Sequence, residues 1–248
     1  MRRFVQKGMI QPSFSSGNSG GGSGGDSIEG YFDGSLAEIT LPNITSIKAN
    51  VFNGDNTITN VIMPKVTSIG ENAFNNCSKL ALTELPSGLT TIGKAAFNQC
   101  GNLRLTSLPS GLTSIGVNAF SGTNIAISSL PSRLTSIESG TFMSCSKMEL
   151  TSLPSGLTTI GSSAFYGCSK IKITSIPSGV TNLGSYAFYY CIGITELTFK
   201  GTPTTINSST FPNCTNLKTI NVPWAEGEVA GAPWGATSAT INYNYVGE

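Results

Sequence analysis

The stretch "LPSGLTTIGKAAFNQCGNLRLTSLPSGLTSIGVNAF", residues 85–120, contains one phrase almost twice. The two copies share the pattern L-P-S-G-L-T-x-I-G-x-x-A-F, and the second begins 23 residues after the first. Outward from this stretch, phenylalanines recur at steps of 22 or 23 residues at Phe52, Phe74, Phe97, Phe120, Phe142, Phe165, Phe188 and Phe211. Prolines keep the same step at Pro42, Pro64, Pro86, Pro109, Pro131, Pro154 and Pro177. This repeat period decides the fold.

A period of about 20–29 residues with apolar positions in fixed phase is typical of a leucine-rich-repeat solenoid. In such a fold each coil buries its apolar edge only against the neighbouring coils. The sequence therefore predicts a mainly β solenoid of about eight to nine coils of 22–23 residues, followed by a C-terminal cap. Because neighbouring strands lie about 4.8 Å apart, nine coils would form a rod of roughly 40 Å.

Each unit opens with an apolar stretch that resembles a strand. The outer units follow the pattern L-x-x-L-x-L at residues 36–41, 58–63, 194–199 and 217–222. The five middle units have L-x-L-x-x-L instead, as at residues 80–85 and 103–108. Since side chains alternate along a strand, this shift predicts either a bulge or a change in which residues face the core, and the sequence leaves both open.

A second apolar pair follows the proline, as in Leu89 with Ile92. An Ala-Phe pair then marks a corner, with the phenylalanine filling the core. Glycines recur just before this corner, and we expect them there because a positive φ costs glycine least. They are Gly93, Gly116, Gly161 and Gly184. The coil is thus predicted to be strand, turn, short strand and turn.

The phrase "LP.GLT.IG..AF..C..L" resembles the BspA-like leucine-rich repeats of bacterial and protist surface proteins. The resemblance covers residues 36 to about 223 and implies a repeat surface that binds host or matrix partners. Two units depart from the pattern, with Thr123 in place of the cysteine and Glu138 in place of the glycine.

The two ends lie outside the repeat. Residues 1–14 are predicted to be a docking peptide without the apolar run of a signal peptide, and residues 15–27 a Gly/Ser-rich linker. The solenoid is assigned to residues 28–223 and its cap to residues 224–248, where Trp224 and Trp234 would cover the last apolar layer and "ATINYNY" would add a strand. The alternative for the tryptophans is a carbohydrate site. The C-terminal segment also resembles repeat proteins of gut bacteria and their phages.

Composition argues against an enzyme. The 248 residues contain no histidine, which removes the Ser/His/Asp triad, the Cys/His pair and the usual zinc sites. Charged residues are only 11%, and 14 Lys+Arg nearly balance 13 Asp+Glu, so no nucleic-acid partner is indicated. No 18-residue apolar span is present, and no cofactor or metal site is expected. We therefore expect a protein without catalytic activity.

Two polar columns have structural explanations. The six cysteines, Cys77, Cys100, Cys145, Cys168, Cys191 and Cys214, each follow the repeat phenylalanine by three residues. They are predicted to stack inward as unpaired thiols, because parallel Cβ vectors suit a disulfide poorly. Threonines stack in phase at Thr45, Thr67, Thr90, Thr113, Thr135, Thr158, Thr181 and Thr204, and a second row contains Thr83, Thr106, Thr151 and Thr174. Such rows are common in strand ladders, although a threonine array could also bind ice.

The variable columns are the predicted binding residues. One reads Ala81, Arg104, Ala126, Glu149 and Lys172, and the column after the phenylalanine reads Asn75, Asn98, Ser121, Met143, Tyr166 and Tyr189. With Tyr186 and Tyr190 the second column gives an aromatic cluster toward the C-terminal end. Exposed tyrosines are common contact residues, but they could instead pack over the adjoining coil or the cap. The candidate ligand-binding residues are Arg104, Glu149, Lys172, Tyr166, Tyr186, Tyr189 and Tyr190.

The expected function is adhesion or recognition of a protein or glycan on a host or bacterial surface, through many weak contacts along one face. The predicted location is extracellular or at the cell surface, without a Sec signal and without direct membrane insertion. Residues 1–14 would serve for docking. The alternative is a structural or receptor-binding component of a phage tail, located in the virion, and a weaker one is an ice or crystal-surface binder.

Overall fold

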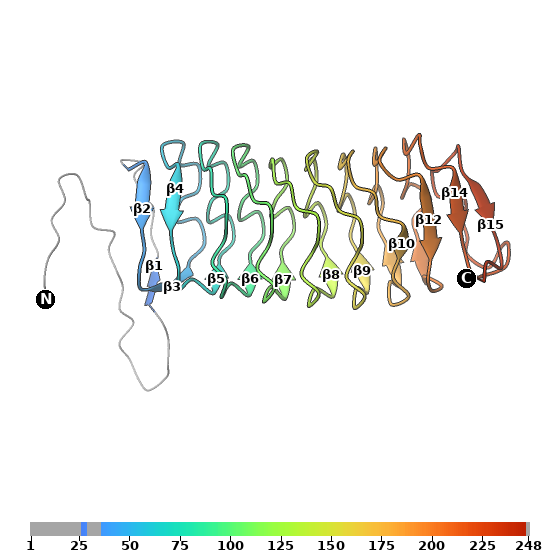
Figure 1. The fold of residues 1–248 in the computed structure, drawn as a ribbon, viewed down its shortest axis with the longest axis horizontal. Coiled ribbons are helices and arrows are strands. Elements are labelled where there is room, and N and C mark those ends of the chain that lie inside the picture. Colours follow the sequence, from blue (N-terminus) through green and yellow to red (C-terminus); the bar gives the residue numbers. More distant parts are fainter. Residues whose placement is uncertain (1–25, 29–35, 247–248) are drawn as a thin grey trace, which may run out of the picture.

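The computed structural model describes residues 26–28 and 36–246, and in this part of the chain every regular element is a strand. The coils stack into an elongated solenoid of about nine turns, with equivalent positions about 23 residues apart (Figure 1). All strand pairs are parallel. The predicted fold class is confirmed. The docking peptide and residues 15–25 of the predicted linker lie outside the described residues, whereas Asp26 and Ser27 already belong to the first strand.

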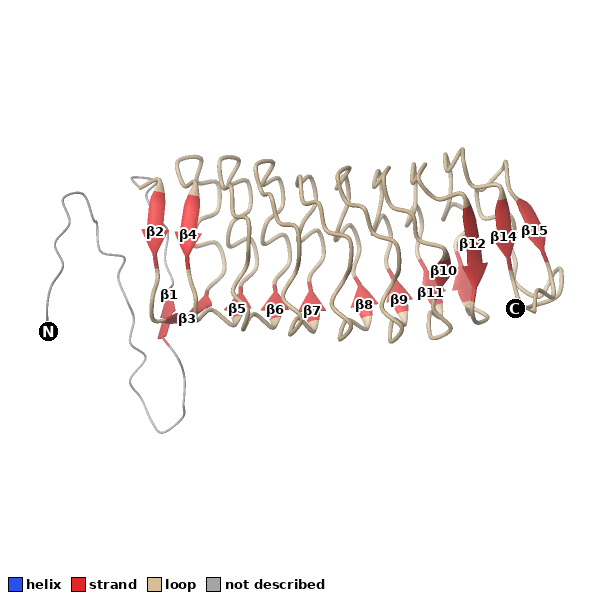
Figure 2. Ribbon diagram, in the orientation of Figure 1, coloured by secondary structure: helices blue, strands red, loops and turns tan. Residues whose placement is uncertain are grey.

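The strands form two columns along the solenoid (Figure 2). One column follows the proline in each unit and is divided into two sheets. The first sheet contains β1 (Asp26–Ile28), β3 (Ile44–Ile47), β5 (Ser68–Ile69), β6 (Thr91–Ile92) and β7 (Ser114–Ile115). The second contains β8 (Ser136–Ile137), β9 (Thr159–Ile160), β11 (Asn182–Leu183) and β13 (Thr205–Ile206). In this column the isoleucine or leucine of each strand from β3 onward points inward and is buried.

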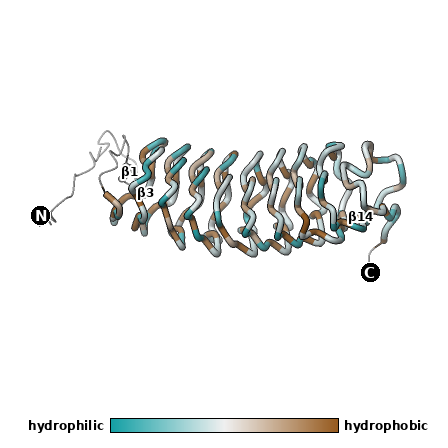
Figure 3. Tube along the Cα trace, turned by 90° about the horizontal axis from the view of Figure 1, so that it is seen from above, coloured by the Kyte–Doolittle hydropathy of each residue, from teal (hydrophilic) through white to brown (hydrophobic). Residues whose placement is uncertain are grey.

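The other column holds the opening stretches. It has a pair of strands at the N-terminal end, β2 (Glu38–Thr40) and β4 (Asn60–Ile62). A four-stranded sheet occupies the C-terminal end and contains β10 (Ser175–Ile176), β12 (Glu196–Phe199), β14 (Thr219–Asn221) and β15 (Thr240–Asn242). Figure 3 shows the same coils from above, with apolar and polar segments alternating around each one.

The pattern shift in the middle units is resolved by the loss of the strand. Between β4 and β10 the opening stretches contain no strand, so a strand in every unit was wrong. Leu80, Leu82 and Leu85 are all buried, with at most 8% of their surface exposed. A regular strand cannot point residues at spacings of two and then three to the same side. The third leucine is thus buried without strand pairing in this unit, whereas its equivalents Leu108, Leu130 and Leu153 are only partly buried.

The core is a continuous stack of phenylalanine rings. All eight repeat phenylalanines are fully buried, and consecutive ring centroids lie 5.0–5.9 Å apart with nearly parallel planes. Aliphatic side chains from both strand columns surround this stack in a single cluster. Since each ring packs on the ring of the neighbouring coil, burial of this layer depends on the stacking of coils, as in other repeat proteins.

The recurrent glycines are needed for a different reason from the one predicted. Gly93, Gly116, Gly161 and Gly184 do not have positive φ; that conformation occurs elsewhere in the coil. A Cβ atom at Gly161 would lie 2.6 Å from the backbone nitrogen of Ser139 in the preceding coil, and the other three positions are equally close. These glycines therefore allow neighbouring backbones to approach closely, which is the second common use of glycine.

The column after the proline has one interruption. β7 and β8 are not paired, and Glu138 occupies the glycine position directly after β8. The Glu138 carboxylate accepts a hydrogen bond from the Ser136 hydroxyl at 2.7 Å. On the opposite edge of the same coils the backbone bonds continue, as from Phe120 N–H to Thr141 O at 2.9 Å. The stack is thus continuous, with an unpaired position near its middle.

The C-terminal segment closes the solenoid. β15 adds a parallel strand to β14, as predicted for "ATINYNY". Trp224 and Trp234 are almost fully buried, and both rings contact Phe199, with centroids at 5.3 and 6.1 Å. This burial supports the capping interpretation. A carbohydrate site lined by the two tryptophans is excluded, because neither indole is accessible.

Candidate binding surface

Four tyrosines from two adjacent coils form one contiguous cluster, called here the tyrosine platform: Tyr166, Tyr186, Tyr189 and Tyr190. Tyr166 stacks on Tyr189 with ring centroids 4.4 Å apart and an angle of 8° between the planes. Tyr186 meets Tyr189 edge to face at 6.1 Å, and Tyr190 lies 6.5 Å from it. The amide of Asn213 donates to the Tyr189 hydroxyl at 2.8 Å. The structure therefore brings together all four predicted tyrosines.

Two of these tyrosines have an unusual backbone conformation. Tyr186 and Tyr190 both have φ of 57°, in the left-handed region. The equivalent positions in other coils hold small or amide residues, such as Asn72 and Gly140 for Tyr186, and Asn76 and Gly167 for Tyr190. Left-handed φ costs about 1–2 kcal/mol per residue for most side chains, and asparagine and glycine bear it best. Large rings at these two turn positions are therefore not explained by local backbone preference.

The same two side chains remain accessible. Tyr186 is 46% exposed and Tyr190 49% exposed, whereas Tyr166 and Tyr189 are partly buried by each other. Partial burial, followed by the nearby phenol of Tyr189, raises the pKa of Tyr166 above its ordinary value near 10. The platform thus combines two partly packed rings with two exposed ones.

The surroundings of the platform carry no formal charge. The three corner segments 161–169, 184–193 and 207–216 contain no Asp, Glu, Lys or Arg. They are rich in tyrosine, serine, glycine and asparagine, the residues that predominate in antibody binding loops. Tyrosine supplies large contact area at low cost in side-chain entropy, and the small polar residues supply hydrogen bonds.

The platform replaces an asparagine ladder. At the N-terminal end of the same column the Asn75 amide donates to Asn53 at 3.0 Å, and the Asn98 amide donates to Asn75 at 2.9 Å. Each amide thus satisfies its neighbour. Ser121 and Met143 then interrupt the series before the tyrosines begin. The change along one column, visible in the sequence, was the signal that located the platform.

The charged candidates lie in a separate column. Arg104, Glu149 and Lys172 are all exposed, and their backbone N–H groups bond to the preceding coil. Glu149 forms an ion pair at 3.3 Å with Lys170 rather than with Lys172. Within the described part of the chain, no hydrogen bond, ion pair or ring contact joins these three residues to the tyrosines. The structure therefore does not unite the two predicted sets.

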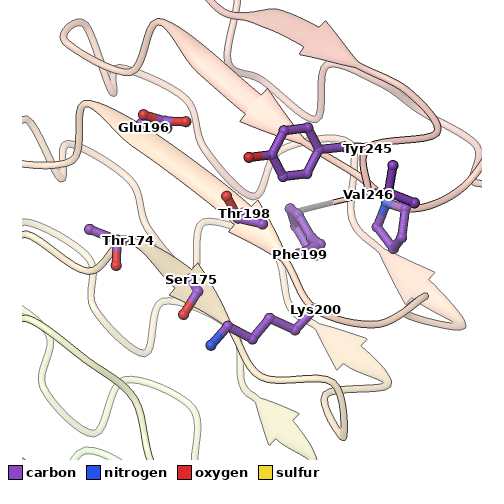
Figure 4. A pocket seen from close by; sticks show the side chains of 9 residues that line it. Thr174, Ser175, Glu196, Thr198, Phe199, Lys200, Tyr245 and Val246 are labelled. Atoms are coloured by element: carbon purple, nitrogen blue, oxygen red, sulfur yellow. The ribbon is translucent and has the colours of Figure 1, made fainter. Parts of the chain in front are cut away.

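A cleft lies on the strand face near the C-terminal end and was not predicted. It has a volume of about 920 Å³ and is lined by Thr174, Ser175, Glu196, Thr198, Phe199, Lys200, Pro223, Tyr245 and Val246. In Figure 4 the Tyr245 phenol points across the cleft toward the side of Glu196 and Thr198. The lining comes from β10, β12 and the tail after β15, and only the assembled sheet brings these segments together.

The cysteine column is structural, as predicted. All six cysteines are buried and unpaired. Each thiol donates to the carbonyl of a phenylalanine in the preceding coil, as from Cys77 to Phe52 at 2.9 Å and from Cys145 to Phe120 at 3.1 Å. Burial raises the pKa of the Cys145 thiol from about 9 to about 12. In the unit without cysteine, the Thr123 hydroxyl donates to Phe120 O at 2.8 Å. Such thiols are poor nucleophiles.

The main threonine row has a bonding role as well. The Thr90 hydroxyl donates to Thr67 O at 3.0 Å, and the Thr158 hydroxyl to Thr135 O at 2.9 Å. These hydroxyl protons therefore form hydrogen bonds to the preceding coil.

No group of three or more metal-binding side chains exists in the described residues. The same described residues contain no helix that is long and apolar enough to cross a membrane, because they form only strands and turns.

One comparison with a solved structure supports the fold. The leucine rich cell surface protein of Faecalibacterium prausnitzii is 22% identical with a TM-score of 0.56, and the match covers 79% of this chain and 66% of that one. The chain thus spans just under two thirds of that protein's length. The leucine-rich repeat protein of T. pallidum is 27% identical, with a TM-score of 0.49 and coverage of 77% and 82%. A search of curated proteins found no match.

The sequence itself matches the BspA type leucine rich repeat region in six copies, over residues 29–149 and 135–226. These two ranges overlap and cover most of the chain, including every coil that contributes to the phenylalanine stack. The repeat pattern, the stacked coils and this match agree, and the chain belongs to the BspA type leucine-rich repeat family.

Proposed function

We propose that this chain is a non-enzymatic binding protein that recognises a protein or glycan at a bacterial or host surface. The observation that carries the proposal is the tyrosine platform, where Tyr186 and Tyr190 combine left-handed φ with exposure of nearly half of each side chain. Neither the backbone preference nor core packing accounts for rings at these positions. Their retention is explained by contact with a partner.

The geometry favours binding over chemistry. Tyr189 is fixed by the ring of Tyr166 and by the Asn213 amide, so little side-chain freedom is lost when a partner binds. No Asp, Glu, Lys or Arg lies in the three platform corners, so the usual charged acid–base groups are missing from these segments. The F. prausnitzii structure of the same fold is described as a cell surface protein, which supports an extracellular or cell-surface setting.

The charged column extends the proposed contact surface. Arg104, Glu149 and Lys172 are exposed on the opening stretches, where side chains vary from coil to coil. In a rigid solenoid such positions keep fixed spacings, so weak contacts at several coils act together. We assign these three residues a secondary role, because one of them already pairs with Lys170 on the protein itself.

The test is binding of fluorescently labelled full chain to intact gut bacteria and to immobilised host matrix proteins. The variant Tyr186→Asn/Tyr190→Asn removes the exposed rings and restores the residue type found at the equivalent positions. Gln99→Asn is the matched control, since Gln99 has φ of 60° in the same turn position of an earlier coil. Saturable binding that the control keeps and the double variant loses supports the proposal. Binding unaffected by the double variant overturns it.

A further inference from the structure

The cleft on the four-stranded sheet contains an organised row of polar side chains. The parallel register places Ser175 beside Thr198, Thr198 beside Asn221, and Asn221 beside Asn242. Along β12, Leu197 and Phe199 point into the core, so Glu196, Thr198 and Lys200 point outward. The outward face of the sheet is therefore polar beneath the tail that carries Tyr245.

A buried amide positions two of these groups. Asn221 is only 2% exposed although it lies on the outward face of the sheet. Its Nδ2 donates to the Glu196 carboxylate at 2.8 Å and to the Thr198 hydroxyl at 3.2 Å. Its own oxygen accepts from the Asn242 amide at 2.8 Å. Because Thr198 accepts from Asn221, its O–H can be donated toward the cleft, and Glu196 retains a second carboxylate oxygen as an acceptor.

The tail supplies the other wall of the cleft. Asn244 has φ of 54°, and its N–H donates to Trp224 O at 2.9 Å. The next residue, Tyr245, donates its N–H to Val222 O at 2.9 Å, so the chain turns back over the sheet. This turn places the Tyr245 ring over the polar row, with 37% of the residue exposed (Figure 4).

We propose that this cleft binds one uncharged sugar residue of a glycan. Pyranose rings present several hydroxyls around an edge and C–H groups on a face. Here a carboxylate can accept from two sugar hydroxyls, Thr198 and Ser175 can donate, and the Tyr245 ring can stack on the C–H face. The cleft volume of about 920 Å³ lies within the usual range for small-molecule sites of about 300–1,000 Å³. Lys200 balances the Glu196 charge in the lining, so the cleft has no net formal charge and suits an uncharged sugar.

This site is separate from the tyrosine platform. The platform lies on the corners after β9 and β11, whereas the cleft lies on β10, β12 and the tail. The inference therefore goes beyond the surface recognition proposed above and does not depend on it. A variant of one site should leave the other intact, so the two proposals can fail independently.

The experiment is saturation-transfer difference NMR of the full chain with free glucose, galactose, mannose and N-acetylglucosamine, each alone. At least one sugar should show transfer to its ring protons. Glu196→Gln keeps the shape of the side chain and its bond to Asn221 but loses the charge, and it should weaken the binding of that sugar roughly tenfold. Thr198→Val should weaken it by a similar factor. Glu38→Gln, an exposed carboxylate at the equivalent position of β2 near the other end of the solenoid, is the matched control and should change nothing.

A second measurement distinguishes loss of the site from loss of the fold. Thermal unfolding of each variant should match that of the parent chain, and the Tyr186→Asn/Tyr190→Asn variant should keep full saturation transfer. No saturation transfer from the folded parent chain to any of the four sugars overturns the proposal. Transfer that survives Glu196→Gln and Thr198→Val together also overturns it, because the sugar then binds elsewhere.

Discussion

Tyr189 stacks face to face on Tyr166 across two coils, with ring centroids 4.4 Å apart. This spacing is shorter than that of any phenylalanine pair in the core, where centroids lie 5.0 Å or more apart. The stacked pair is therefore closely packed, and the rings of Tyr186 and Tyr190 lie beside it. An interface that is ordered before binding loses less entropy when the partner arrives.

The left-handed φ of Tyr190 gives a first prediction. Tyr190→Asn should leave the fold intact and raise the free energy of unfolding by up to about 1 kcal/mol, because asparagine tolerates this conformation better. Binding to the surface partner should fall at the same time. Urea unfolding and the cell-binding assay together check this. A variant that is less stable than the parent would show that the ring has a packing role.

Close approach of the coils gives a second prediction. Gly161→Ala should lower the free energy of unfolding by about 1–3 kcal/mol, because the new Cβ would lie 2.6 Å from the backbone of Ser139. Gly156→Ala is the matched control, since no atom lies within 4 Å of a Cβ built there. Urea midpoints of the two variants make the comparison. Equal midpoints would contradict the explanation of the glycine column.

The thiol column predicts a pH dependence. Burial raises the pKa of Cys214 to about 11 and of Cys145 to about 12, whereas unfolded thiols titrate near 8.5. Between these values the unfolded chain holds fewer protons than the folded one. The free energy of unfolding should therefore be constant below about pH 8 and should fall as the pH rises toward 11.

Denaturation at pH 7.5 and pH 10 measures this fall, and Cys145→Thr should reduce it. Threonine is a suitable replacement, because Thr123 already occupies the column and its hydroxyl donates to the carbonyl three residues earlier, Phe120 O, as a threonine at position 145 could donate to Phe142 O. Native chains should also resist Ellman's reagent at pH 8 and react at all six thiols in urea. Rapid labelling of the folded chain would refute the burial of the column.

The phenylalanine stack predicts the largest loss of stability. Phe142→Ala removes a fully buried ring between two stacked neighbours, and should cost about 3–5 kcal/mol of unfolding free energy. Phe142→Leu should cost clearly less, since most of the volume remains. Calorimetry of both variants tests the ranking. Similar small losses for both would mean that the stack contributes little.

Much of this architecture could be predicted from the repeat. The period fixes which residues are equivalent, so Phe142 and Cys145 were placed in the core without coordinates. The role of Gly161 could not be derived in this way, because it depends on the distance between two backbones and not on φ. The missing strands between β4 and β10 could not be derived either, because the shifted pattern is compatible with a bulge or with a change in which residues face the core.

The two proposed binding surfaces also differ in whether they could be predicted from the sequence. The tyrosine platform could be predicted because Tyr166 and Tyr189 share a column that changes from asparagine to tyrosine along the chain, and because Tyr186 and Tyr190 lie next to Tyr189 in the same corner. The sugar cleft could not, since Glu196 and Asn221 come from different units and Tyr245 from a tail outside the repeat. Residues joined only by the fold of a cap give no periodic signal.

The most direct test of the central claim is the affinity of the full chain for the cell or matrix surface that it binds, measured beside Tyr186→Asn/Tyr190→Asn and Gln99→Asn. Each ring is expected to contribute about 1–2 kcal/mol, so the double variant should bind at least roughly tenfold more weakly, while Gln99→Asn binds like the parent chain. Equal affinity of all three chains would show that the tyrosine platform does not carry recognition.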